Sequence, residues 1–271
     1  MNNSLLRAAA LALLATLLTA CGGGGSAPTP TPTPVPTPTP TLSNVLGVTV
    51  DTGPTGSGYN VNRLYATVKI CQPGSTTQCG TIDHVLVDTG STGLRLLSSA
   101  IAPSLGLARS TGATGFPLLN CVQFVDNTFA WGPVVTADIV LGGKTAAAVP
   151  IQIIADPAFS SPAGACSIGG TAMTSSANLG ANGIVGLGLF KEDCGAGCTA
   201  TTHNGFYYTC TSASCTTTTG AKATLAQQVK NPVPLFSTDN NGVLVELPAV
   251  NSTIATSLTG SLIFGVATQA N

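Results

Sequence analysis

The sequence predicts an all-β domain of mainly antiparallel strands with few short helices. Gly, Thr, Ser and Val are abundant, with 32 Gly among 271 residues, and short apolar runs alternate with turn-forming segments. Helix signals are sparse. A hydrophobic content of 44% with only 7% charged residues is enough for one sizeable core. We therefore expect a single folded domain over residues 42–271, preceded by sequence that does not belong to it.

The first twenty residues are typical of a bacterial lipoprotein signal. Arg7 precedes an apolar run from Ala8 to Leu18, and Leu18-Thr19-Ala20-Cys21 forms a lipobox. The run is too short to span a bilayer, and removal of residues 1–20 leaves Cys21 as the acylated N-terminus. The alternative is an ordinary signal peptide followed by an incidental cysteine.

Residues 21–41 are expected to be a lipid-anchored tether, a Gly run followed by Thr-Pro repeats. They lack the apolar side chains that a core requires. Polyproline geometry, at about 3 Å per residue, would hold the domain roughly 40 Å from the membrane. We expect a location in the bacterial cell envelope, at the outer membrane or cell surface.

Several strands follow the tether. Val45 to Val50 is the first, and Tyr65 to Ile70 alternates as a half-exposed hairpin arm does. The clearest helix signal comes late, where Thr224 and Gln227 form a capping box and Pro232 ends the segment. This predicts a short surface helix before the last strands.

The segment from Val85 to Leu97 is the most informative in the chain. Val85 to Val87 has the pattern of a buried strand and Leu94 to Leu97 that of its return, which places Asp88 at the tip of a strand-loop-strand unit. A carboxylate there is costly unless it is hydrogen bonded. The donors available are those of Thr89, Gly90 and Ser91. Asp88 is therefore a candidate for acid–base chemistry, and the alternative is an Asx-type turn.

The pattern of apolar residues, Asp-Thr-Gly-Ser and a further apolar strand resembles the active-site loop of pepsin-like aspartic proteases. Three other segments resemble that family in order: 65–70, the strand before the active-site strand; 181–189, the strand beside the catalytic loop; and 260–265, the strand that closes the first lobe. The resemblance covers most of residues 65–265 and implies the first lobe of this fold, which retropepsins share. The whole chain also resembles a group of bacterial lipoproteins that carry such a domain.

The resemblance implies a role for each residue of the loop that carries Asp88. Asp88 would be one half of a catalytic dyad, and Thr89 would lock the two loops of the dyad together. Ser91, beyond Gly90, would hydrogen bond the Asp88 carboxylate.

Two features depart from the family pattern. Arg95 stands where the family usually has a large aromatic residue that supports the flap tyrosine. The flap itself corresponds to the hairpin from Cys121 to Val140, which contains no tyrosine and offers Phe129 or Trp131 instead.

The chemistry of this family needs a second carboxylate, because two Asp share one proton to activate a water. Asp51-Thr52-Gly53 repeats the motif, but Pro54 follows and no apolar return strand comes next, as in a simple turn. We therefore expect that the second lobe of a two-lobed protein is missing. A homodimer with Asp88 from each subunit is the other way to form a dyad.

The chain has nine cysteines, and setting Cys21 aside leaves eight, an even number that suits disulfides outside the cytoplasm. Cys71 and Cys79 flank a turn-rich loop and form the first expected bridge. The spacing of Cys194, Cys198, Cys210 and Cys215 also fits a four-thiolate zinc site. Export favours disulfides at these four positions, because exported thiols oxidise.

Other function classes find little support. A formal net charge of −1 without a basic stripe excludes nucleic acid as the expected partner. The two histidines, His84 and His203, form no metal-binding pair, and we place His84 on the strand face opposite Val85 and Val87. Residues 165–169 approach a nucleophile elbow but lack its first Gly. We expect no metal and no cofactor.

Two functions remain after these exclusions. The first is an aspartic-type endopeptidase lobe that acts on polypeptides and is inactive as a monomer. The alternative is a non-catalytic binding or structural lipoprotein on the same fold, which the altered flap, Arg95 and the single complete motif favour.

Overall fold

The computed structural model describes residues 44–58, 60–250 and 255–268. The chain divides into two units, Met1–Pro40 and Thr41–Asn271, and every described residue belongs to the second. The expected signal segment, the lipidation site Cys21 and the tether lie outside the described residues.

The described residues are mostly β-strand, which confirms the predicted all-β class. The strands are β1 (Val45–Asp51), β2 (Arg63–Cys71), β3 (Cys79–Asp88), β4 (Thr92–Leu97), β5 (Leu118–Gln123), β6 (Thr128–Leu141), β7 (Lys144–Ile154), β8 (Thr171–Ala172), β9 (Gly183–Leu187), β10 (Tyr207–Cys210), β11 (Thr218–Gly220), β12 (Val243–Glu246) and β13 (Leu258–Phe264).

The helices are short, as predicted. They are η1 (Ser98–Ala100), η2 (Pro103–Leu105), η3 (Pro157–Phe159), α1 (Gly164–Ser167), α2 (Ser176–Leu179), α3 (Ala196–Ala200) and η4 (Val233–Leu235). None of the helices in the described ranges has the length and apolar character needed to cross a membrane.

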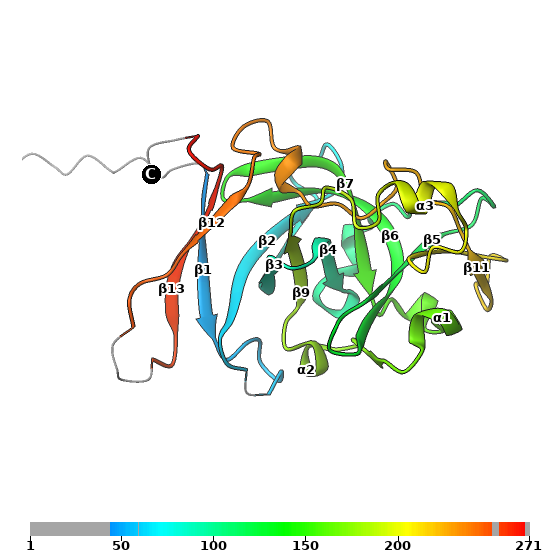
Figure 1. Cartoon of the computed structure of the whole chain (residues 1–271), viewed down its shortest axis with the longest axis horizontal. Helices are drawn as coiled ribbons and strands as arrows, with labels where there is room; N and C mark the ends of the chain where they lie inside the picture. The colour runs from blue at the N-terminus through cyan, green and yellow to red at the C-terminus, as the bar shows by residue number, and fades with distance from the viewer. Residues whose placement is uncertain (1–43, 59, 251–254, 269–271) are drawn as a thin grey trace, which may run out of the picture. The chain divides into compact units, whose positions relative to one another are not determined.

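The strands pair in the order β11-β10-β5-β6-β7-β4-β9-β3-β2-β1-β13-β12. Figure 1 shows β12, β13 and β1 at one end of this series and β5 and β11 at the other. Strand β6 pairs with β7 and also with β2, so the strands from β2 through β3, β9, β4 and β7 to β6 form a closed ring. Asp88 belongs to this ring.

The sheet is mixed, so the prediction of an antiparallel sheet is wrong in part. Strand β9 pairs in parallel with β3 and antiparallel with β4, and β4 pairs in parallel with β7. The reason is geometric. Strands β3 and β4 run in opposite directions on either side of β9, so β9 must be parallel to one of them.

The main core fills the region enclosed by these strands. Its buried members include Val68 of β2, Val85 of β3, Leu94 of β4, Ile151 of β7 and Val185 of β9. Every residue of β9 is buried, which explains why its sequence is continuously apolar except for Gly. Each such aliphatic side chain stabilises the fold by about 1.5–3 kcal/mol on full burial.

All eight cysteines of the described residues form disulfides, which confirms the disulfide prediction. Cys71 pairs with Cys79, as predicted. The other bridges are Cys121–Cys166, Cys194–Cys198 and Cys210–Cys215. The four cysteines with zinc-like spacing therefore form two local bridges, and no cluster suited to a metal ion occurs in the described ranges.

The Cys121–Cys166 bridge is expected to stabilise the protein more than Cys71–Cys79. It spans 45 residues, whereas Cys71–Cys79 spans 8, and a longer closed loop removes more entropy from the unfolded chain. Replacing each pair by two serines should cost about 4 and about 2.5 kcal/mol respectively in denaturant unfolding. Equal costs would contradict this ranking, and a thiol titration of unfolded, unreduced protein should find no free thiol among these eight.

The predicted helix at residues 224–229 is wrong. One of the two capping-box contacts forms, since the Thr224 N–H donates to Gln227 Oε1 at 3.0 Å, but the Gln227 N–H donates to the Thr224 carbonyl rather than to its hydroxyl. The segment nevertheless makes only a turn. The side chain of Gln227 donates to Thr111 O at 2.9 Å, so tertiary contacts rather than a continued helix determine the conformation.

Candidate active site

Asp88 is the last residue of β3, and its Cα is paired with that of Gly186 on the parallel strand β9. On the other side of β9, Gly93 of β4 is paired with the same glycine. The loop of residues 89–91 therefore passes over the end of β9. This is the expected position of Asp88 beside residues 184–187.

Gly186 is required by the close approach of this loop. A Cβ atom at Gly186 would lie 2.6 Å from the backbone N of Thr92 and 2.7 Å from the carbonyl carbon of Ser91. Real Cβ atoms do not come so close to backbone, so any other residue would displace the loop. The apolar-apolar-Gly pattern of β9 thus has a direct steric cause.

One hydrogen bond from the loop holds the Asp88 carboxylate. The N–H of Gly90 donates to Asp88 Oδ1 at 2.8 Å. The hydroxyl of Ser91 is buried and has no hydrogen-bond partner among the described residues, so the expected bond from Ser91 to Asp88 is not formed. Asp88 is half-buried and Thr89 is exposed.

Asp88 opens onto a cavity of about 450 Å³. The walls come from the ends of β2 and β3, from the turn between β5 and β6, and from residues near α2. The members are Asn62, Arg63, Leu64, Leu86, Val87, Phe124, Val125, Asp126, Met173, Leu179 and Ile184. Apolar walls with a few polar groups are typical of a cleft that binds an organic ligand.

The other carboxylate of this cavity, Asp126, is a turn residue. Its Oδ1 accepts hydrogen bonds from the hydroxyl and the N–H of Thr128 at 2.6 and 3.0 Å. These bonds hold the pKa of Asp126 below its ordinary value, which keeps Asp126 ionised. Asp126 is exposed, and its hydrogen bonds with Thr128 stabilise the turn between β5 and β6, which accounts for an aspartate at this position.

Phe129 and Trp131, the expected flap residues, do not line the Asp88 cavity. Both are buried in a separate cluster with Cys121, Cys166 and Tyr208. The indole N–H of Trp131 donates to the carbonyl of Phe159 at 2.8 Å, which satisfies its polar group. The hairpin instead presents Phe124 and Val125, and Val125 is fully exposed at its tip.

Asp51, from the second Asp-Thr-Gly copy, ends β1 and lines a different cavity, of about 150 Å³, that does not include Asp88. The N–H of Gly53 donates to Asp51 Oδ1 at 2.8 Å, as in an Asx turn. Strand β1 pairs with β2 and β13. The geometry thus fits the expected turn.

His84 lies at an irregularity of the β2–β3 pairing and has a positive φ of 47°. Its Nδ1 lies 2.6 Å from Asp83 Oδ2, and its Nε2 lies 3.3 Å from Asp51 Oδ2. A β-bulge of this kind redirects a side chain, which alternation along the strand cannot anticipate. The sequence pattern therefore missed these contacts.

Arg95 forms a buried polar network behind the loop. Its guanidinium donates to Asn120 Oδ1 at 2.5 Å, to Gln152 Oε1 at 2.7 Å and to Asp193 Oδ2 at 2.9 Å. The side chains of Arg95 and Asp193 are only 1% and 3% exposed. Arg95 thus connects β4, β5, β7 and the segment after β9.

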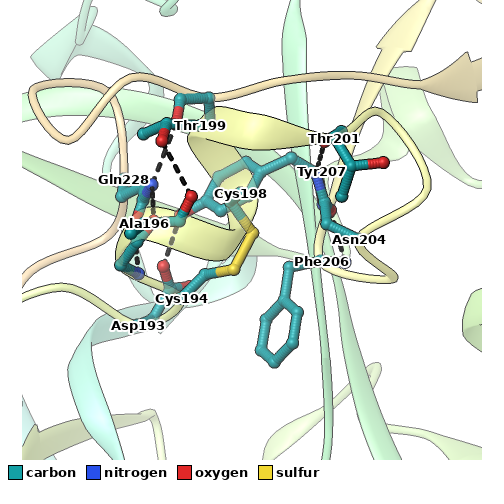
Figure 2. Close-up of a disulfide and its surroundings, with 12 residues drawn as sticks. Asp193, Cys194, Ala196, Cys198, Thr199, Thr201, Asn204, Phe206, Tyr207 and Gln228 are labelled. Atoms are coloured by element: carbon teal, nitrogen blue, oxygen red, sulfur yellow. Dashed lines mark hydrogen bonds between the residues drawn. A yellow bond between two sulfur atoms is a disulfide. The ribbon is translucent and has the colours of Figure 1, made fainter.

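Tyr207 completes this network. Its hydroxyl donates to Asp193 Oδ1 at 2.5 Å and accepts the N–H of Val229 at 2.8 Å. Figure 2 shows Tyr207 and Asp193, together with the Cys194–Cys198 disulfide that closes the segment after Asp193. Asp193 lies 98 residues from Arg95 in the sequence, so no local pattern could predict that the two side chains form an ion pair.

The free energy of unfolding is expected to fall at alkaline pH because of Tyr207. Burial, and then the Asp193 carboxylate, raise the pKa of Tyr207 well above its ordinary value of 10.0. Above about pH 10 the unfolded chain releases a phenolic proton that the folded protein keeps, so the free energy of unfolding decreases as the pH rises. Denaturant unfolding between about pH 8 and about pH 11 should show a shallower decrease for Tyr207→Phe.

At neutral pH, Tyr207→Phe should also lower the free energy of unfolding by about 1–3 kcal/mol, because Asp193 loses a donor. Identical pH slopes for the two proteins would contradict the assignment of the alkaline decrease to Tyr207.

The chain belongs to the family described as "Protein of unknown function (DUF3443)", whose profile matches residues 40–271. This match includes every described residue and begins close to the expected end of the tether. A search among curated proteins finds no match.

Proposed function

We propose that this chain is an aspartic-endopeptidase-type lobe of a bacterial envelope lipoprotein, and that Asp88 is one half of a catalytic dyad. The observation that carries the proposal is the position of Asp88. It ends β3 opposite Gly186 of β9, accepts the N–H of Gly90, and faces a largely apolar cavity. The resemblance of residues 65–265 to a pepsin-like first lobe supports the same assignment.

The chemistry requires two carboxyl groups that share one proton. The ionised carboxyl takes a proton from a water, which attacks the scissile carbonyl, while the protonated carboxyl hydrogen bonds to the carbonyl oxygen. Asp126 is the other carboxylate of the cavity, but it is exposed and its Oδ1 is bound within its own turn by the N–H and hydroxyl of Thr128. The second member of the dyad therefore has to come from a second lobe or a second copy.

The surface around the loop supports a partner at this position. Thr89 is exposed, and Leu189 and Phe190, just beyond β9, are 100% and 73% exposed. Thr89 and Leu189 also line a depression of about 390 Å³. Large apolar side chains that gather at a loop in this way are typical of an interface.

The signal and tether patterns of the sequence support an activity outside the cytoplasm, with a lipid on Cys21 as the proposed link to a membrane. The substrate class is polypeptide. The four disulfides agree with an oxidising compartment.

A non-catalytic binding lipoprotein is the second candidate, and the burial of Phe129 and Trp131 favours it. The hairpin over the cavity offers Phe124 and Val125, whose side chains carry no polar group for a transition state. A binding module needs only the apolar walls of this cavity.

A joint measurement of assembly and cleavage tests the proposal. We expect purified protein that sediments as a monomer to leave an unfolded protein substrate intact from about pH 3 to about pH 7. A dimeric or reconstituted two-lobe form should cleave it at acid pH and bind a statine-type transition-state mimic. If the paired forms do neither, the binding module becomes the better assignment. Cleavage by a proven monomer would refute the proposed dyad.

A further inference from the structure

A second cavity lies apart from Asp88. It has a volume of about 810 Å³, and none of its lining residues belongs to the Asp88 cavity. Its apolar walls include Ile101 and Leu107, with Val135 of β6 and Ile153 of β7, and its charged groups are Arg109 and Asp156. A volume in this range, with apolar walls and few polar groups, is typical of a site for a small organic ligand.

The wall that carries Arg109 is fixed to β6. Arg109 forms an isolated β-bridge with Val135. On either side of it, Ser110 N donates to Val134 O at 2.8 Å and Thr136 N donates to Ala108 O at 3.0 Å. The backbone of Arg109 is therefore held in place by a strand of the closed ring, and its side chain starts from a defined position.

The guanidinium of Arg109 is held as well. One of its terminal nitrogens donates to Asp156 Oδ2 at 3.1 Å, and its central carbon lies 4.9 Å from the centroid of the Phe159 ring. Asp156 is itself fixed, because its Oδ1 accepts the N–H of Ala158 at 2.9 Å. An arginine has five N–H donors, so donors remain for a planar anion.

We propose that this cavity binds a small molecule that carries a carboxylate on an apolar body. The apolar walls take the body, and Arg109 takes the carboxylate. An ammonium group is a poorer fit, because the charge of the Asp156 carboxylate is already paired with the Arg109 guanidinium. The site uses no residue of the proposed catalytic loop, so the two proposals stand or fail separately.

This ligand chemistry has two natural sources, a free fatty acid and the C-terminal end of a short apolar peptide. Decanoate and N-acetyl-leucyl-valine represent them. Calorimetric titration of the wild-type protein with each probe identifies the source, since the better-fitting body should bind more tightly. Decanol, which lacks the carboxylate, is the matched control ligand.

Three variants test the role of the charges. Arg109→Gln should weaken binding of the preferred probe by about tenfold or more, because a charge-assisted hydrogen bond is lost. Asp156→Asn should bind as tightly as wild type or more tightly, because its amide oxygen still caps Ala158 and the competing negative charge is gone. Lys222→Gln removes an exposed cation outside this cavity and should leave binding unchanged.

Ala102→Trp tests the cavity itself. Ala102 is exposed and lines it, so the indole should block entry and abolish binding without disturbing the core. The proposal is overturned if neither probe binds wild type at millimolar concentration, if Arg109→Gln binds as wild type does, or if Ala102→Trp still binds.

Discussion

Replacing Arg95 by methionine is expected to lower the free energy of unfolding by about 3–5 kcal/mol. The ion pair of Arg95 and Asp193 is almost fully removed from water, and the substitution leaves the Asp193 carboxylate buried without its cation. Tyr207 and Asn120 still donate to Asp193, but neither carries a charge. Denaturant unfolding with the disulfides intact measures the loss.

The double variant Arg95→Met/Asp193→Leu should recover part of this loss, because Asn120, Gln152 and Tyr207 still lose hydrogen-bond partners. Replacing both members of a buried pair removes the desolvation cost together with the attraction. The pair of Arg109 and Asp156, whose side chains are 47% and 16% exposed, is the comparison: because Arg109 is in contact with water, Arg109→Met should cost only about 0–1 kcal/mol. If Arg95→Met and Arg109→Met lowered the free energy of unfolding equally, burial of the Arg95 ion pair would not be the cause of the loss.

The second large effect is expected on activity. In any paired form that cleaves polypeptide, Asp88→Asn should lower kcat/KM by more than about a thousandfold, because an amide cannot exchange the proton that the dyad shares. The fold should persist. Asparagine has nearly the same shape, and its oxygen still accepts the N–H of Gly90.

Asp51→Asn is the control for this substitution. Asp51 begins the other Asp-Thr-Gly copy in the chain, but it lines a different cavity. Its oxygen also accepts an N–H two residues later, from Gly53. We expect cleavage to change by less than about twofold, since Asp51 has no part in the dyad. A comparable loss in both variants would show that the motif acts through stability rather than chemistry.

Apolar runs, glycines and cysteine spacing predicted those features of the fold that depend on neighbouring residues in the sequence. Residues 85–87 of β3 and the buried strand β9 are apolar apart from glycine, and Gly186 is needed where the backbone of Ser91 and Thr92 passes close by. The position of Asp88 beside Gly186 was instead expected from the resemblance of these two segments to a pepsin-like lobe. The Cys71–Cys79 bridge could be predicted because its partners flank a single hairpin loop.

Contacts between distant segments could not be predicted in the same way. Arg95 and Asp193 meet across 98 residues, and neither shows a local sign of burial. Phe129 and Trp131 lie two residues apart, so alternation correctly predicts that they share one face of the strand. It does not predict whether that face lines a cavity or packs into a core, and here it packs into a core. The parallel pairing of β3 with β9 likewise follows from topology and not from either strand sequence.

The most direct test of the account is the cleavage rate of two covalently joined copies of this chain that carry Asp88 in both copies, in one or in neither, with Asp88→Asn as the replacement. We predict cleavage of an unfolded protein substrate at acid pH only when both copies carry Asp88, and equal inactivity for the other two forms. Activity in the form with a single Asp88 would contradict the account. So would inactivity of all three forms combined with failure to bind a statine-type mimic.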